Sequence, residues 1–304
     1  MGETSRRLLA LLAAALVPLG ALAATPGDRM IALPDKRKVH LVCSGAGAPT
    51  VLLESGFGAD SGAWYKVQPL VARYTRVCSY DRAGYGKSSP GPLPRDGEAI
   101  AADLDAALRA AHVGGPYVLV GHSAGGLYMR LLAARRPGQV TGLVLVDPSV
   151  EHQTRRIAAE FGPGAGSVDG IRESAARCLN AVEARAKGIP DPAAAACGPG
   201  SAGLWRTQVS EIETLFTTTS DQVVAKRPRV RDVPTTILTA TPNEGPTLDP
   251  GERLHRRMHA ELAGEFRTAR QQLVRSGHLM MLDRPEVIAQ AVGERVRAWR
   301  SRRR

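Results

Sequence analysis

Short, uniformly apolar segments recur along the chain and alternate with longer segments of helical periodicity. Four of these apolar segments lie in the first half of the chain, at residues 50–53, 76–80, 116–120 and 143–146. Each is bounded by turn residues, which is typical of strands buried on both faces. Residues 98–111 instead place Ile100, Leu104 and Leu108 on one stripe, and residues 64–72 and 124–136 also favour helix. This alternation predicts an α/β fold with a mainly parallel sheet and helices on both faces.

The pattern changes near both ends of the chain. Polar and apolar residues alternate over 30–33 and 39–43, which predicts a hairpin of two strands. Towards the other end, Asp283 with Glu286 three residues later is a candidate N-cap. A last helix is therefore expected to start at Asp283.

No strand pattern is visible over residues 150–229, which are rich in Ala, Gly and Pro and helical in patches. The strand signal returns at 235–239 and again at 269–274. We interpret 150–229 as a helical lid inserted between two parts of one core, residues 25–149 and 230–304.

The first 24 residues have the pattern of a signal peptide. Arg6-Arg7 precedes an apolar stretch, and Ala21-Leu22-Ala23 supplies small residues for cleavage. The stretch is short and broken at Pro18, so it is a poor membrane span. We expect a secreted or periplasmic protein, exported by the Sec route or, given the paired arginines, by the twin-arginine route. An uncleaved N-terminal anchor is the alternative.

Four cysteines in an exported chain favour disulfides. Pairing by neighbourhood gives Cys43–Cys78 and Cys178–Cys197. No C-x-x-C or Cys/His spacing suggests a metal site.

The formal net charge is +11, but the arginines are scattered along the chain. Only the run Arg300–Arg304 forms a cluster, which we interpret as a solvated tail. No zinc-finger or RRM signature is present, so nucleic acid is not expected as a partner.

The segment Gly121-His122-Ser123-Ala124-Gly125 matches G-x-S-x-G between an apolar strand and a helix. In such a nucleophile elbow the serine occupies a strained turn, and side chains at Gly121 and Gly125 would collide with the flanking strand and helix. Ser123 is therefore the candidate nucleophile.

The elbow resembles that of the esterase, lipase and peptidase branches of the α/β-hydrolase superfamily. Residues 81–88 are similar to the D-R-x-G-x-G-x-S loop of the same superfamily. The resemblance covers most of residues 29–304 and implies an eight-stranded, mainly parallel sheet with an inserted lid. It also implies that Asp81 and Arg82 brace a loop and are not catalytic.

A serine needs a nearby base, and His278 is the best placed of seven histidines because it follows the last predicted strand. The resemblance implies the chain order Ser, acid, His. His122 is expected to pack inside the elbow. His255 and His259 could share a helix face near the lid, in surface or pocket roles.

The acid that orients His278 is ambiguous. The superfamily commonly places it after the strand at 235–239, where Glu244 and Asp249 are available. Some relatives place it after the preceding strand, where Asp147 stands at a sharply defined strand end. We choose Asp147 and keep Asp249 and Glu244 as alternatives.

An oxyanion hole requires two preorganised N–H groups. The amide of Ala124 is one candidate. The loop 54–58 looks like the H-G-x-G loop of relatives, with Ser55 where histidine is usual, and it offers Phe57 as the second donor.

These residues predict a serine hydrolase that cleaves an ester or related acyl bond of a small molecule through an acyl-enzyme on Ser123. No dinucleotide fingerprint, P-loop or metal cluster is visible, so no cofactor is expected. A nucleophilic aspartate, as in epoxide hydrolases, is disfavoured because position 123 is serine. A prolyl-type aminopeptidase and a C–C bond hydrolase share the same triad, and a non-catalytic ligand-binding protein is the alternative from another class.

Apolar residues of the predicted lid leave two interpretations open. Leu204, Trp205, Ile212, Leu215 and Phe216 could form an apolar acyl pocket or the lid's own small core.

Overall fold

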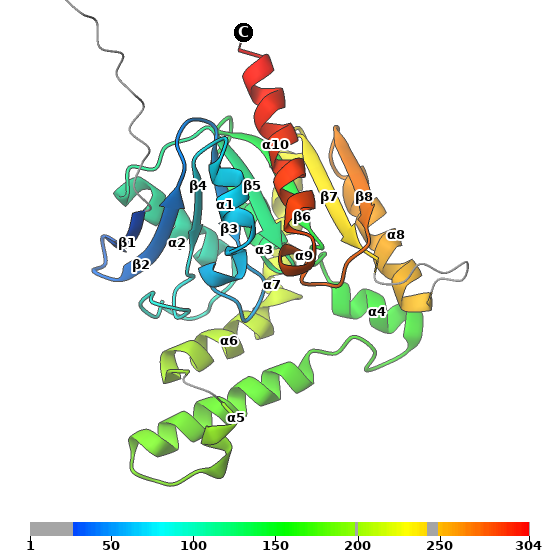
Figure 1. Cartoon of the computed structure of the whole chain (residues 1–304). Helices are drawn as coiled ribbons and strands as arrows, with labels where there is room; N and C mark the ends of the chain where they lie inside the picture. The colour runs from blue at the N-terminus through cyan, green and yellow to red at the C-terminus, as the bar shows by residue number, and fades with distance from the viewer. Residues whose placement is uncertain (1–26, 198–199, 242–248, 304) are drawn as a thin grey trace, which may run out of the picture.

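The molecule is built around one eight-stranded sheet (Figure 1). The computed structural model describes residues 27–197, 200–241 and 249–303. The strands are β1 (Gly27–Ala32), β2 (Lys38–Ser44), β3 (Thr50–Glu54), β4 (Val77–Tyr80), β5 (Tyr117–His122), β6 (Val140–Val146), β7 (Thr235–Ala240) and β8 (Ala269–Val274). They lie in the order β1-β2-β4-β3-β5-β6-β7-β8. Strands β3 to β8 are parallel, whereas β2 runs antiparallel to both β1 and β4.

Uniformly apolar strands form at the centre of the sheet because both of its faces are covered. Successive side chains of a strand point to opposite faces. In β6, Leu143 and Leu145 therefore enter one hydrophobic core, and Val144 and Val146 enter the other. The alternation explains why these strands contain few polar residues.

Helices supply the outer layers of both cores. On one face lie the 3-10 turn η1 (Ser61–Trp64), α1 (Val67–Ala72), α9 (Met280–Asp283) and α10 (Pro285–Ser301). On the other face lie α2 (Gly97–Ala110), α3 (Gly125–Arg135), α7 (Thr218–Val230) and α8 (Pro250–Gly264). This arrangement confirms the predicted fold class.

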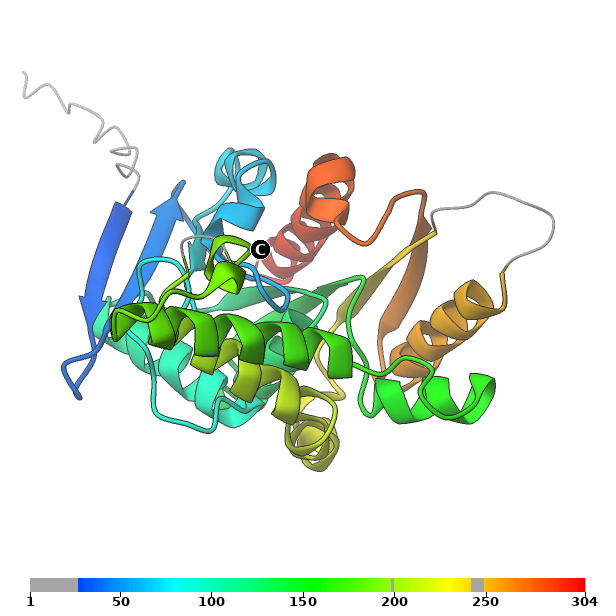
Figure 2. The same cartoon turned by 90° about the horizontal axis from the view of Figure 1, so that it is seen from below.

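The chain between β6 and β7 is helical. It contains α4 (Gln153–Phe161), α5 (Asp169–Ala186), the 3-10 turn η2 (Pro192–Ala195), α6 (Ala202–Leu215) and α7. α7 packs against α2 and α3, so it belongs to the layer on the sheet. In Figure 2, seen from below, α5 lies across the sheet, and it packs against α6.

Two disulfides join segments that are close in space. Cys43–Cys78 links the paired strands β2 and β4, and Cys178–Cys197 ties the end of the η2 segment to α5. Both pairs are those predicted from neighbourhood. The bonds are compatible with an extracellular protein.

Two expectations about the C-terminal region are wrong. The last helix begins at Pro285 and not at Asp283, because the Asp283 carboxylate accepts hydrogen bonds from Ser276 Oγ and Gly277 N and therefore does not cap α10. Arg300 is also no part of a solvated tail. It lies in α10 and donates to the carbonyl oxygens of Ala48 and Tyr74.

The predicted signal peptide, residues 1–24, lies outside the described residues. Among the helices that the structure describes, none is both long and apolar enough to span a bilayer.

Candidate active site

Ser123 stands on a sharp turn between β5 and α3. Its φ of +52° is in the left-handed region, which costs a non-glycine residue about 1 kcal/mol or more. The turn is held by hydrogen bonds from Ser123 N to Val146 O, 3.1 Å, and from Ser149 N to Ser123 O, 3.0 Å. Strained backbone that neighbouring strands hold in place is common at functional sites.

The glycines of the elbow are required by close approach, as predicted. A Cβ on Gly121 would lie 2.4 Å from the carbonyl oxygen of Gly125. A Cβ on Gly125 would lie 2.7 Å from the carbonyl oxygen of Glu54. Both oxygens belong to the backbone, so neither could move aside without distorting the turn.

Asp147 follows β6 at the same edge of the sheet and is buried. Its Oδ2 lies 2.6 Å from His278 Nδ1, and its Oδ1 lies 2.8 Å from His255 Nε2. Oδ1 also accepts from the amide of Ala240, 2.9 Å away. Burial raises the pKa of Asp147, but the hydrogen bonds from both histidines outweigh it and hold the pKa well below its usual range.

His278 lies in the loop between β8 and α9, with 54% of its side chain exposed. Because Nδ1 faces a carboxylate, we assign the proton to Nδ1, which leaves Nε2 as the basic nitrogen. The Ser123 hydroxyl makes no hydrogen bond to any residue that the structure describes, although Ser123 and His278 line the same pocket. Hydrogen bonds between nucleophile and base often tighten only when substrate binds.

His122 fixes the position of the His278 loop. Its Nε2 donates to the carbonyl oxygen of His278, 2.9 Å away, and the two ring centroids are 4.6 Å apart. Burial lowers the pKa of His122 to about 4, so the ring is neutral at pH 7. The prediction that His122 packs inside the elbow did not include this contact.

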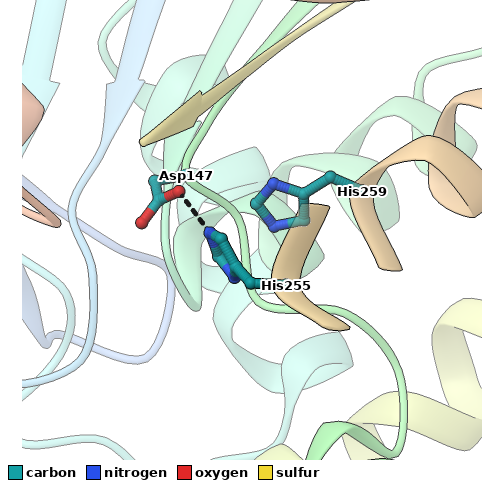
Figure 3. A group of neighbouring side chains, drawn as sticks. All are labelled: Asp147, His255 and His259. Atoms are coloured by element: carbon teal, nitrogen blue, oxygen red, sulfur yellow. Dashed lines mark hydrogen bonds and ion pairs between the residues drawn. The ribbon is translucent and has the colours of Figure 1, made fainter. Parts of the chain in front are cut away.

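Asp147, His255 and His259 form a cluster that could be mistaken for a metal centre (Figure 3). His259, however, is buried with both ring nitrogens engaged: Nε2 donates to Pro148 O at 2.8 Å, and Nδ1 lies 2.9 Å from Thr239 Oγ1. A metal ion would have to displace these contacts. The donor set therefore fits a hydrogen-bonded cluster better than a cation site.

The two predicted oxyanion donors, Ala124 N and Phe57 N, lie beside the nucleophile. Ala124 follows Ser123 directly, and the Phe57 side chain lines the pocket. Neither amide donates a hydrogen bond within the part of the chain that the structure describes. Both N–H groups are therefore available to a substrate oxygen.

The pocket at Ser123 has a volume of about 490 Å³. One part of its lining is apolar and includes Phe57, Val168, Ile171, Ile212, Leu215 and Phe216, whereas Ser149, Gln153, Thr154 and His255 add polar groups to those of Ser123, Asp147 and His278. Leu204 and Trp205 do not line it. Three of the five apolar residues singled out in the sequence thus face the pocket, and Ile212 and Leu215 also belong to the core.

The structure brings Ser123, His278 and Asp147 together and separates them from the alternative acid Asp249. The Asp249 side chain caps α8 by accepting from the amides of Gly251 and Glu252. Glu244, the other alternative, lies outside the described residues. Sequence reasoning missed the contact of His255 with Asp147, for which the spacing of four residues from His259 was the only signal.

Comparison with known proteins agrees with this fold. Among solved structures, a haloalkane dehalogenase DbeA variant from Bradyrhizobium elkanii superposes with a TM-score of 0.68 at 21% identity, covering 92% of this chain and 99% of that one. An esterase (EaEST) from Exiguobacterium antarcticum superposes with a TM-score of 0.63 at 17% identity, covering 88% and 98%. At these identities the likeness establishes the fold alone.

Curated relatives match over shorter segments. YqjL from Bacillus subtilis (strain 168), an uncharacterized protein, is 32% identical over 35% of this chain and 42% of its own length. The "Putative carbamate hydrolase RutD" from Klebsiella pneumoniae (strain 342) is 39% identical over 33% of this chain and 38% of its own length. The chain thus spans about two fifths of the length of these two relatives. The family model described as "Alpha/beta hydrolase family" matches residues 50–291, so this chain belongs to the α/β-hydrolase family.

Proposed function

We propose that this chain is an exported serine hydrolase that cleaves an ester or a related acyl bond through an acyl-enzyme on Ser123. The observation that carries the proposal is the 2.6 Å contact between Asp147 Oδ2 and His278 Nδ1, at the pocket that Ser123 also lines. It keeps the proton on Nδ1 and leaves Nε2 free to take the proton of a serine hydroxyl.

The reaction follows from these roles. His278 Nε2 accepts the Ser123 proton while Oγ attacks the substrate carbonyl, and the amides of Ala124 and Phe57 stabilise the oxyanion. His278 then gives the proton to the leaving alcohol, and the acyl group remains on Ser123. In the second half, His278 takes a proton from water, the hydroxide attacks the acyl carbonyl, and Ser123 recovers its proton as the acid departs. Asp147 stabilises the imidazolium throughout.

One relative and the pocket support an acyl substrate. RutD is named as a putative carbamate hydrolase, and a carbamate is an acyl compound. The apolar part of the lining, which includes Phe57, Ile212 and Phe216, suits an aliphatic or aromatic acyl group. The helices between β6 and β7 contribute part of this lining, which supports their interpretation as a lid.

Export remains part of the proposal. The two disulfides within the described residues suit an oxidising compartment. The N-terminal sequence pattern adds the second argument, because it contains a basic segment, an apolar segment and a small-residue cleavage site.

A fluorophosphonate probe tests the proposed nucleophile, because only an activated serine displaces its fluoride readily. The probe should label the wild-type protein at the peptide that contains Ser123, and Ser123→Ala should abolish labelling. Ser149→Ala is the matched control, since Ser149 lines the same pocket but does not stand on the left-handed turn between β5 and α3. Labelling that survives Ser123→Ala would place the activated nucleophile at another residue and refute the assignment. Absence of labelling in the folded wild-type protein would favour a ligand-binding protein.

A further inference from the structure

Arg82, which was expected only to brace a loop, is almost completely buried. It donates hydrogen bonds to the segment beside the nucleophile. Its Nη1 donates to the carbonyl oxygen of Ser55 at 2.8 Å, and its Nη2 donates to that of Gly56 at 2.9 Å. Nη1 also lies 2.8 Å from Glu54 Oε1. A forked guanidinium suits this task, because it can donate to several oxygens in one plane.

The peptide held by Arg82 is the one that supplies the proposed oxyanion donor. Gly56 O and Phe57 N–H belong to a single peptide unit, which is trans, so they point in opposite directions. Arg82 on the carbonyl side therefore fixes the N–H on the other side. The nucleophile is close to this peptide, since a Cβ on Gly56 would lie 3.1 Å from Ser123 Cβ.

The same guanidinium also contacts the helical insertion. Arg82 Nη2 lies 3.2 Å from Oε1 of Glu211, which is 1% exposed and lies on α6. This oxygen also accepts from the hydroxyl of Tyr128, on the helix that follows the elbow. The next residue, Ile212, lines the substrate pocket. One cation thus touches both the oxyanion loop and a helix of the insertion.

We infer that Arg82 is a positioning residue that orients the Phe57 N–H toward the substrate oxyanion. We further infer that Glu211, through its contact with Arg82, makes this orientation depend on the position of α6. The inference rests on the proposed function, because it assigns Phe57 N–H to the oxyanion of the acyl-transfer reaction. Hydrogen bonding at Gly56 O also polarises the peptide and strengthens its N–H as a donor.

Arg82→Lys keeps the positive charge but removes the planar guanidinium that donates to several oxygens at once. The test compares its kcat and KM for p-nitrophenyl butyrate, its inhibition by butylboronic acid, which forms a tetrahedral adduct on serine, and its inhibition by butyramide. We expect kcat to fall about 10- to 100-fold, the boronate inhibition constant to rise by a similar factor, and that of butyramide to stay within about twofold. Hydrogen exchange of the segment 54–60 should become faster.

Two further variants complete the test. Tyr80→Phe removes another hydrogen bond to Glu54 without touching Gly56, so it should leave kcat and the boronate inhibition constant within about twofold. Glu211→Gln is isosteric and should move kcat and boronate inhibition in the direction of Arg82→Lys by about 3- to 10-fold. No effect of Glu211→Gln would overturn the coupling to α6.

Unchanged boronate inhibition in Arg82→Lys, or equal weakening of boronate and butyramide, would overturn the positioning role. Failure of the proposed function would give a different result. Either the wild-type protein would not hydrolyse the ester, or Ser123→Ala would hydrolyse it as well as the wild-type protein does. In both cases the serine hydrolase and the positioning role of Arg82 would be refuted together.

Discussion

Asp147 is shared by two histidines: His278 Nδ1 lies 2.6 Å from Oδ2, and His255 Nε2 lies 2.8 Å from Oδ1. His255 therefore helps to hold the carboxylate that orients His278. His255→Ala should lower kcat about tenfold, since it removes a charge-assisted hydrogen bond. His255→Gln, whose amide nitrogen can still donate to Asp147, should retain most activity. Equal losses in both variants, measured as kcat with an ester substrate, would contradict this role.

Mutagenesis can decide directly between Asp147 and Asp249 as the acid that orients His278. Asp147→Asn should lower kcat by about three orders of magnitude, because an amide no longer stabilises the imidazolium or selects its tautomer. Asp249→Asn is the matched control and should leave kcat unchanged, with a loss of at most about 1 kcal/mol of stability from the cap of α8. A larger loss of activity in Asp249→Asn than in Asp147→Asn would reverse the assignment.

Two buried histidines make stability depend on pH. Burial lowers the pKa of His122 and of His259 to about 4, from 6.5. Between these values the unfolded chain binds protons that the folded chain does not. The free energy of unfolding should therefore fall from pH 7 to pH 5, by roughly 2 kcal/mol per histidine. Burial raises the pKa of Glu54 to about 6, which has the opposite sign and offsets roughly 1 kcal/mol of the loss.

Urea unfolding at pH 7 and pH 5 checks this prediction. The charges of His255, Asp147 and His278 also act on His259. The wild-type protein is therefore compared with a variant that removes the ionisable group of His259 and leaves these three residues in place. His259→Gln should unfold with a smaller difference between the two pH values than the wild-type protein. An unchanged difference would show that His259 is not the group responsible.

The apolar pocket wall should control acyl length. Phe216, the residue that directly follows α6, is partly buried and lines the pocket, whereas Leu204, within α6, does not. Phe216→Ala should raise the ratio of kcat/KM for p-nitrophenyl decanoate over butyrate by about tenfold, since each additional buried methylene contributes about 0.8 kcal/mol. Leu204→Ala should leave the ratio unchanged. Similar shifts in both variants would indicate a general loosening of α6.

The sheet could be predicted from the sequence because its central strands are buried on both faces and therefore uniformly apolar. Ser123 and the strand-end position of Asp147 were visible for the same reason: each directly follows such a strand. The loop motif indicated that Arg82 braces a loop, but its partners there, and the contacts of His255 and Glu211, were not visible, since these contacts join residues that are distant in sequence. The start of α10 was misplaced because Asp283 looks like a cap but binds the loop before His278.

Initial rates of p-nitrophenyl ester hydrolysis, from acetate to palmitate, test the central claim most directly when wild-type protein and Ser123→Ala are compared. We predict saturable hydrolysis by the wild-type protein and a loss of at least about three orders of magnitude in kcat for the variant, with the fold intact by circular dichroism. Hydrolysis at the same rate by Ser123→Ala, or none by folded wild-type protein on any ester, would contradict the assignment of Ser123 as the nucleophile of an ester hydrolase.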